Sequence, residues 1–169
     1  VFDAVLNFKY PKTVHLRGYS GRYIGQEDHV TRAVEALAAA RKPLLLAGGG
    51  VILSNTSGYL RSFVEKTQIP VITTLMGKGA VPDSYANNLG MHGSYAANMA
   101  VMECDLLMAI GSRFDDRVTG DAENFAPNAQ IVHFDIDKVE INKIVHADIS
   151  VGGDLRWSLP LLANQVQQG

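Results

Sequence analysis

The sequence predicts an α/β fold, doubly wound around a mainly parallel sheet with helices on both faces. Several short segments are apolar at every position, which is typical of strands buried on both faces of a sheet. These segments alternate along the chain with amphipathic helical patterns, as the strands and crossover helices of a parallel sheet do. The chain has 169 residues, the size of one ordinary domain, and the pattern predicts a single domain.

The first predicted elements are a linker and a helix. Residues 1–26 are irregular, with Pro11 and several glycines, and we interpret them as a linker that wraps onto the domain. From Glu27 to about Lys42 apolar side chains recur every three to four residues, which predicts an amphipathic helix. Asp28 is its expected N-cap, and Pro43 is expected to stop it.

Strands and helices then alternate to the end of the chain. The first strand, 43–47, is wholly apolar and ends at consecutive glycines. The helix after it carries Leu60, Phe63 and Val64 on one face. The complete set of later predictions comprises strands at 69–74, 106–110, 131–136 and 146–151, and helices at 57–68, 95–103, 139–143 and 155–166.

The composition narrows the function classes. Apolar residues make up 47% of the chain and the net charge is -2, which gives no general attraction for nucleic acid or for an anionic membrane. Any bound phosphate must be held locally by arginines and backbone amides. No apolar stretch approaches 18 residues and no leader is visible, so we expect a cytoplasmic (bacterial) protein. Val1 stands where an initiator methionine is expected, which indicates a fragment or a processed product.

Cys104 is the only cysteine. An internal disulfide and a multi-cysteine metal site are therefore excluded. Because this residue lies in an apolar run between Met102 and Leu106, we expect a buried, inert thiol rather than a nucleophile. The lone histidines lack paired ligands, and the sequence predicts no metal site.

The carboxyl ends of the strands are where ligands bind in such sheets. Gly48, Gly49 and Gly50 follow the first strand, and glycine lets the backbone approach a ligand closely. The amides of the next helix would face an anion; a tight strand-to-helix turn is the other interpretation. The dinucleotide fingerprint is broken, since Leu53 replaces its third glycine, and no acidic residue ends the next strand. Both observations argue against a nicotinamide site.

Two further loops offer polar and apolar contacts. Residues 73–79 supply Thr74, Leu75 and exposed amides for a ring or a sugar, or they form a plain glycine-rich loop with a solvated lysine. Residues 89–93 place Met91 and His92 between glycines, where a thioether could pack on an aromatic face. The histidine could equally be a structural donor.

The most informative segment is 111–120, which directly follows a buried strand. It carries Arg113 and Arg117 with two aspartates between them, and arginine grips phosphate bidentately. The four charges could instead pair with one another. After the next strand, Asp135 could accept bonds from ribose or ribityl hydroxyls, whereas Asp137 and Asp154 could each cap a following helix.

Taken together, these strand ends suit a large nucleotide-like ligand with a pyrophosphate. The sequence shows no nucleophile–base pair, no metal cluster and no carboxylate dyad, so it predicts binding rather than catalysis, and no catalytic residue.

The segments 89–93 and 113–120 closely resemble the large subunit of the acetolactate synthase (acetohydroxyacid synthase) family of thiamine-diphosphate enzymes. The likeness extends from about Val30 to Leu162 and includes 47–50, 74–77 and 133–137. It implies that residues 27–169 are the middle of three domains, Rossmann-like and FAD-binding, and that residues 1–26 link it to a missing N-terminal domain.

Family roles transfer onto matching positions. The implied FAD contacts are Gly48, Gly49, Thr74, Leu75, Leu89, Gly90, Met91, His92, Gly111, Arg113, Asp115, Arg117, Val118, Asp135, Ile136, Asp154 and Leu155. Positions near the mouth of the active site, where inhibitors bind, are Met91, Asp116 and Arg117.

The resemblance also implies the activity of the whole enzyme. It is a transferase that condenses pyruvate with pyruvate or 2-ketobutyrate in branched-chain amino-acid biosynthesis, with thiamine diphosphate and magnesium held by other domains and the flavin in a mainly structural role. We expect the fragment itself to be inactive, and the parent enzyme to form a homo-oligomer with a regulatory small subunit. The alternatives are a scaffold or ADP-binding middle domain of another thiamine-diphosphate keto-acid decarboxylase or synthase, and a free-standing nucleotide enzyme.

Overall fold

The computed structural model describes Asn7, Lys9 and residues 24–166. The predicted linker over 1–26 therefore lies almost entirely outside the described residues. Among the described helices, none is long and apolar enough to cross a membrane.

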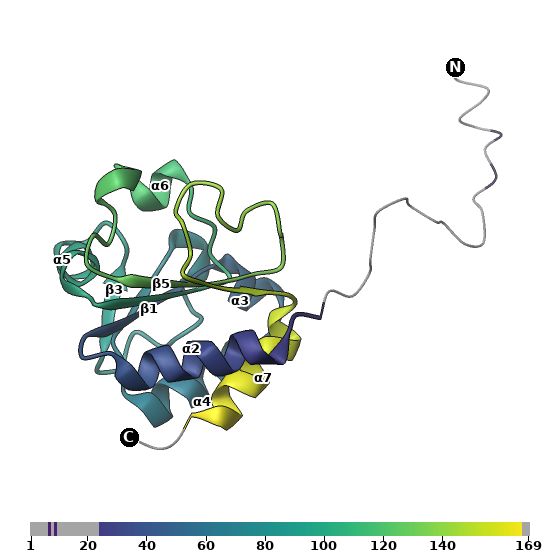
Figure 1. Cartoon of the computed structure of the whole chain (residues 1–169), viewed down its shortest axis with the longest axis horizontal. Coiled ribbons are helices and arrows are strands. Elements are labelled where there is room, and N and C mark those ends of the chain that lie inside the picture. Colours follow the sequence, from purple (N-terminus) through teal and green to yellow (C-terminus); the bar gives the residue numbers. More distant parts are fainter. Residues whose placement is uncertain (1–6, 8, 10–23, 167–169) are drawn as a thin grey trace.

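The sheet has six strands, and every pairing between neighbouring strands is parallel. Its order is β3-β2-β1-β4-β5-β6, so the chain builds outward from β1 in one direction, returns, and builds outward from β4 in the other (Figure 1). This confirms the doubly wound α/β prediction. The strands are β1 (Pro43–Ala47), β2 (Val71–Thr73), β3 (Asn88–Met91), β4 (Leu106–Ile110), β5 (Gln130–Asp135) and β6 (Ile149–Gly152).

Helices cover both faces of the sheet. On one face α2 (Glu27–Ala39) and α4 (Ser57–Thr67) both pack against α7 (Leu155–Gln165), and Figure 1 shows the three together. The other face is covered by α5 (Tyr95–Glu103), whose buried Ala97 belongs to the second hydrophobic cluster. The short helices are α3 (Gly49–Leu53), α6 (Asp116–Thr119), η1 (Leu75–Gly77) and η2 (Ala122–Asn124).

The wholly apolar strands follow from this double cover. Successive side chains of a strand point to opposite faces. In β1, Leu45 joins the hydrophobic cluster under α2, α4 and α7, while Leu44 and Leu46 join the cluster under α5. In β4, Met108 belongs to the cluster under α2, α4 and α7, and Ala109 belongs to the cluster under α5. Neither face meets water, so no polar position interrupts the strand.

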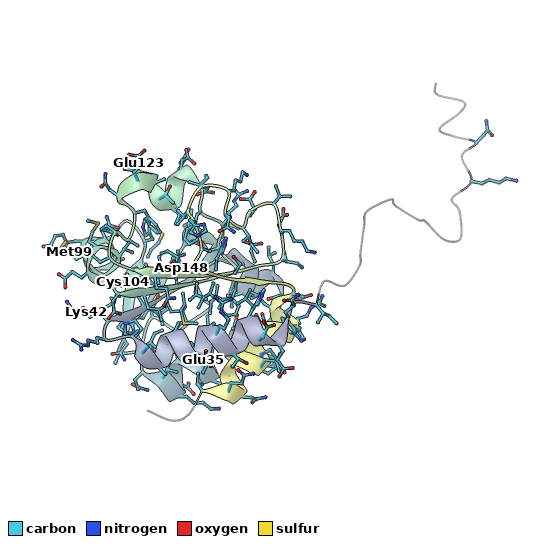
Figure 2. All side chains as sticks on the ribbon, viewed as in Figure 1. Glu35, Lys42, Met99, Cys104, Glu123 and Asp148 are labelled. Carbon is cyan, nitrogen blue, oxygen red and sulfur yellow. The ribbon has the colours of Figure 1, made fainter. Side chains whose placement is uncertain are left out.

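Cys104 lies at the end of α5 (Figure 2), and its thiol donates to the Val101 carbonyl oxygen at 3.3 Å. The side chain is 3% exposed, and desolvation by burial raises the pKa of the thiol to about 11. This confirms the expected buried thiol.

The ends of α2 differ from the prediction. Gln26 is the N-cap residue and makes no side-chain capping bond, while Asp28 lies inside the first turn. The helix ends at Ala39 rather than near Lys42. The Asp105 carboxylate explains the earlier end, because it accepts the backbone amides of Arg41 and Lys42 at 2.8 and 2.9 Å. Pro43 then begins β1 instead of stopping the helix.

Two other predictions are corrected. The helix expected at 139–143 is a series of turns, in which Asp137 accepts the Val139 amide and Asn142 adopts a φ of 62°. The loop expected at 89–93 overlaps the edge strand β3, which spans Asn88–Met91. Periodicity could not reveal β3, because the strand is short, half-buried and contains Gly90 at a φ of 92°.

Candidate functional site

The centre of the site is the switch point between β1 and β4, where the two halves of the sheet meet. Gly48 donates its amide to Ile110 O, and Gly50 donates to Gly111 O, both at 2.9 Å. A Cβ on Gly48 would lie 2.2 Å from Gly111 O. Gly111 itself has a φ of 60°. Glycine at Gly48 is therefore required by the contact between two backbone segments. Gly50 also lies against Gly111, and both Gly49 and Gly50 line the adjacent cavity.

The start of α3 is less open to an anion than expected. Gly50 N bonds to Gly111 O at 2.9 Å and Val51 N bonds to Gly48 O at 3.2 Å. These amides are already paired within the protein. These two amides are therefore not available to an anion, and the side chains of Arg113 and Arg117 supply cationic groups at the same edge.

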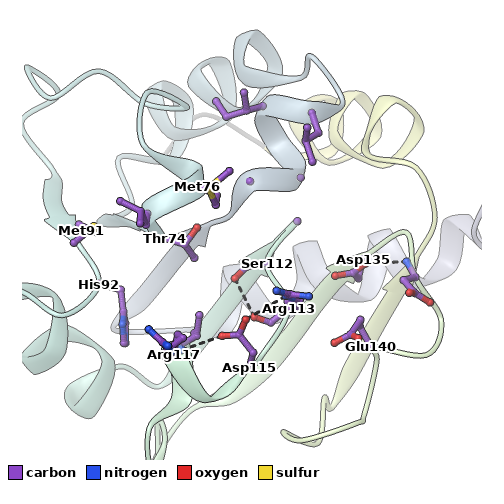
Figure 3. Close-up of a pocket in the computed structure, with 18 residues that line it drawn as sticks. Thr74, Met76, Met91, His92, Ser112, Arg113, Asp115, Arg117, Asp135 and Glu140 are labelled. Carbon is purple, nitrogen blue, oxygen red and sulfur yellow. Dashed lines mark hydrogen bonds and ion pairs between the residues drawn. The ribbon is translucent and has the colours of Figure 1, made fainter.

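A cavity of about 730 Å³ opens at this edge of the sheet (Figure 3). It extends from the end of β2, across β1 and β4, to the end of β5. Its lining residues are Gly49, Gly50, Ile52, Leu53, Thr74, Leu75, Met76, Met91, His92, Gly111, Ser112, Arg113, Asp115, Arg117, Val118, Asp135, Asp137 and Glu140.

One wall of the cavity is charged. The Arg113 Nε lies 3.2 Å from Asp115 Oδ2. Asp115 is also the N-cap of α6, where its Oδ1 accepts the Val118 amide at 3.2 Å. The exposed side chain of Arg117 makes no ion pair with a described residue, and Figure 3 places it beside the opening. Mutual pairing thus accounts for Arg113 and Asp115 but leaves Arg117 available.

Apolar groups form the facing wall. Leu75 and Met76 are adjacent, 70% and 73% exposed, and both line the cavity, and a contiguous exposed apolar patch is typical of a binding surface. Thr74 uses its hydroxyl oxygen to cap η1, accepting the Gly77 amide at 3.1 Å. Burial lowers the pKa of His92, which keeps its imidazole neutral at pH 7. The wall therefore combines an apolar surface with a neutral ring.

The end of the cavity at β5 is acidic. Asp135 is 8% exposed, and its Oδ1 accepts the Asp137 amide at 2.8 Å. Its backbone carbonyl accepts Gly153 N at 2.9 Å, which brings the loop before α7 alongside. Asp137 and Glu140 complete this end. Its carboxylates are suited to accept hydrogen bonds from hydroxyl groups.

The structure gathers most of the predicted site residues around this cavity. Those that line it are Gly49, Thr74, Leu75, Met91, His92, Gly111, Arg113, Asp115, Arg117, Val118 and Asp135. Those outside the lining are Gly48, Leu89, Gly90, Asp116, Ile136, Asp154 and Leu155.

The residues outside the lining have other contacts. Leu89 packs on the cluster under α5. Leu155 is buried, and its Cδ1 would lie 2.9 Å from a Cβ on Gly111. Asp154 caps α7 by accepting the Arg156 amide at 2.9 Å, as one of the two interpretations predicted. The side-chain hydrogen bond from Arg156 also lowers the pKa of Asp154.

Some lining residues were not among the predicted contacts: Ile52, Leu53, Met76, Ser112, Asp137 and Glu140. Gly50 also lines the cavity, and it belongs to the glycine segment for which ligand contact and a tight turn were the two interpretations. Met76 and Asp137 lie next to predicted contacts in the sequence, which is the signal that could have found them. Glu140 lies in the segment predicted as a helix and found as turns, so its place at the cavity had no sequence signal.

Comparison with known families assigns the domain. Residues 30–162 match the family described as "Thiamine pyrophosphate enzyme, central domain". This chain belongs to that family. The resemblance inferred from the two motif segments is thereby confirmed at the level of the central domain.

Curated relatives of this central domain are acetolactate synthases. The large subunit from Buchnera aphidicola subsp. Schizaphis graminum is 46% identical over 156 residues, covering 90% of this chain and 27% of the relative. The enzyme from Mycobacterium bovis is 46% identical over 159 residues, covering 92% of this chain and 26% of the relative. The large subunit from Corynebacterium glutamicum is 45% identical over 165 residues, covering 96% of this chain and 26% of the relative. The chain thus spans about a quarter of the length of these relatives.

Proposed function

We propose that this central domain binds FAD across the switch point and is part of an acetolactate synthase. The observation that carries the proposal is the cavity of about 730 Å³, which runs from an apolar wall, past two arginines, to an acidic end. Ligand pockets commonly measure roughly 300–1,000 Å³. The three environments suit, in that order, a flat ring, a diphosphate and the hydroxyls of a sugar.

The residues present fit such a ligand. Leu75, Met76 and Met91 expose apolar side chains that suit the flavin ring. Arg113 and Arg117 would hold the diphosphate, with Arg117 as the stronger candidate because it has no ion pair with a described residue. The remaining proposed contacts are the site residues predicted from the family.

The adenosine end of the ligand would extend past the cavity. Asp135 pairs in register with Gly152 of β6, and its carbonyl accepts Gly153 N. Asp154 and Leu155 follow directly at the start of α7. The predicted contacts at Ile136, Asp154 and Leu155 therefore border the acidic end, although they lie outside the cavity lining.

The parent enzyme, in this proposal, condenses pyruvate with pyruvate or 2-ketobutyrate in branched-chain amino-acid biosynthesis. Thiamine diphosphate, when bound with magnesium by other domains, supplies the electron sink for decarboxylation. The residues of this chain hold the flavin and, through Met91, Asp116 and Arg117, border the mouth of the active site. We propose no catalytic residue within the chain.

The organisation of the whole protein belongs to the same proposal. Residues 27–169 form the central domain, whose first described helix begins at Glu27, and residues 1–26 link it to a preceding domain. Two of the relatives are named large subunits. We accordingly propose a homo-oligomer with a regulatory small subunit as the assembly of the parent enzyme.

Flavin binding is tested by titrating the purified chain with FAD and following flavin fluorescence, the visible spectrum and the thermal midpoint. We expect a change in all three, and we expect ADP to compete because it shares the adenosine diphosphate. No response to excess FAD would overturn the proposal. Binding of ADP without FAD would favour the alternative, a scaffold or ADP-binding middle domain. Incubation with pyruvate and thiamine diphosphate should yield no acetolactate from the chain alone.

A further inference from the structure

His133 lies beneath the charged wall of the cavity without lining it. It belongs to β5 and is fully buried. Its Nε2 lies 2.9 Å from the backbone carbonyl oxygen of Ser112. Ser112 is the first residue after Gly111 in the segment that carries the charged wall.

The Ser112 carbonyl needs a partner that the sheet does not supply. Pairing between β4 and β5 runs through Ile110 and Phe134, and Gly111 N then donates to Phe134 O at 2.9 Å. Beyond this bond the chain leaves the sheet, yet Ser112 remains 4% exposed. A buried carbonyl must be hydrogen-bonded. The His133 side chain provides the bond where the strand ladder stops.

The same ring also contacts the residue on the other side of Arg113. The rings of His133 and Phe114 have centroids 4.7 Å apart. The His133 ring thus contacts both neighbours of Arg113: it is hydrogen-bonded to the Ser112 carbonyl and packs against the Phe114 ring. Phe114 in turn packs edge-on against Phe125 at 5.7 Å. This arrangement restricts the backbone from which Arg113 reaches the cavity.

The hydrogen bonds of the imidazole indicate why position 133 holds a histidine: its contact with the Ser112 carbonyl is the hydrogen bond that an apolar side chain could not make. With Nε2 donating, Nδ1 is an acceptor, and Nδ1 has no hydrogen-bond partner among the described residues. Asp135 Oδ2 lies 3.6 Å from Nε2, beyond a good hydrogen bond. A purely apolar side chain would fill the same space without an unpaired buried atom, but it would leave Ser112 O unpaired.

We propose that His133 is a positioning residue of the cavity: it fixes the segment around Arg113 for an anionic ligand group such as the diphosphate of a nucleotide. The inference rests on the proposed function for the identity of that group. The placement of the segment itself does not depend on it.

The test compares His133→Gln with His133→Asn. A glutamine amide can reach the position of Nε2 and donate to Ser112, whereas the shorter asparagine amide stops near the position of Nδ1. We expect His133→Asn to weaken binding of both FAD and ADP about tenfold, the loss of roughly one hydrogen bond. His133→Gln should recover most of the affinity. His133→Leu, which has no donor, should resemble the asparagine variant.

The matched control is Ile131→Ala, two residues away on the same strand and buried in the hydrophobic cluster under α5. It should lower the thermal midpoint while leaving the affinity for FAD unchanged. Equal affinities of the glutamine and asparagine variants, or an equal loss in the control, would show a merely structural role and overturn the inference.

A second readout separates this inference from the flavin proposal. Amide hydrogen exchange of residues 112–118 is measured without ligand, in wild type and in each variant. We expect faster exchange in His133→Asn and His133→Leu than in His133→Gln and Ile131→Ala. If wild type binds neither FAD nor ADP, the proposed function fails while this comparison still decides the role of His133. Unchanged exchange in all variants would count against it.

Discussion

The centre of the cavity and its acidic end are built by different means. At the switch point, backbone packs on backbone: Gly48 and Gly50 lie against Gly111. At the acidic end, side chains hold the backbone of a turn: Asp135 accepts the amide of Asp137, which in turn accepts the amide of Val139. Contacts between backbones leave no room for a side chain. At the acidic end, a substitution removes one hydrogen bond between a side chain and the turn. At the switch point, any added side chain would collide with the backbone, so we expect substitutions there to destabilise the fold far more.

The largest effect is expected from Gly48→Ala. Its Cβ would lie 2.2 Å from Gly111 O, and neither backbone segment can yield without disturbing the sheet. We expect a loss of about 3 kcal/mol in unfolding free energy, the upper end of the usual cost of overpacking. Urea denaturation measures it. The matched control is Gly58→Ala in α4, where a Cβ would meet nothing within 4 Å; a similar loss there would contradict the role of the contact.

The second prediction concerns Arg117, on the charged wall of the cavity. Arg117→Ala should weaken FAD binding roughly 10- to 100-fold, the equivalent of a charge-assisted hydrogen bond. The fold should be stable to within about 0.5 kcal/mol, because the side chain is exposed and has no ion pair with a described residue. Titration calorimetry and thermal melting measure the two quantities. Arg32→Ala, on the exposed surface of α2, should change neither, and an unchanged affinity in Arg117→Ala would assign that residue to the solvated surface.

A third, smaller effect is expected next to the acidic end. The hydrogen bond from Arg156 holds the pKa of Asp154 below its usual value of 3.8, so the charged form favours the folded state. That stability is present above the unfolded pKa and is lost as the pH falls through the folded pKa. Asp154→Asn, which can still cap α7, should therefore be less stable than wild type at pH 7. The difference should shrink below pH 3.8; a difference independent of pH would exclude the ion pair as its cause.

The smallest effect is expected in the turn itself. Glu140 Oε1 lies 2.8 Å from Lys143 Nζ, with the lysine side chain 51% exposed and the glutamate side chain 18% exposed. Because the lysine is half solvated, we expect the pair to contribute no more than an exposed ion pair does, about 0–1 kcal/mol. Glu140→Gln should change the unfolding free energy by less than about 0.5 kcal/mol. Urea denaturation in low and high salt checks this value. A loss as large as that of Gly48→Ala would contradict the contrast between the switch point and the acidic end.

Local pattern was sufficient for the elements that repeat a simple rule. The apolar run 106–110 predicted β4, and the spacing of Leu60, Phe63 and Val64 predicted α4. It was insufficient where a bond from elsewhere in the chain ends an element. The Asp105 carboxylate accepts a hydrogen bond from the backbone amide of Arg41, which therefore does not continue α2. Asp105 lies far from α2 in the sequence, so a local pattern around α2 cannot include it.

The same division holds for the site. Each glycine, arginine and aspartate that follows a strand was visible as a candidate, since parallel strands place their carboxyl ends on one edge. Which of them face the cavity was not visible: Asp115 caps α6 and lines the cavity, whereas Asp154 caps α7 and lies outside the lining. Glu140 reached the cavity through a turn that periodicity described as a helix.

The sequence by itself determined the fold class, the order of most elements and the edge of the sheet where a ligand would bind, because apolar runs and strand-end residues are local properties. Only the tertiary structure decided that the backbone at Gly48 lies directly against Gly111, with no room for a side chain. It also decided that Arg117 has no ion pair among the described residues and that the His133 ring is hydrogen-bonded to the Ser112 carbonyl. These facts depend on distances between segments far apart in the chain, and no local pattern contains them.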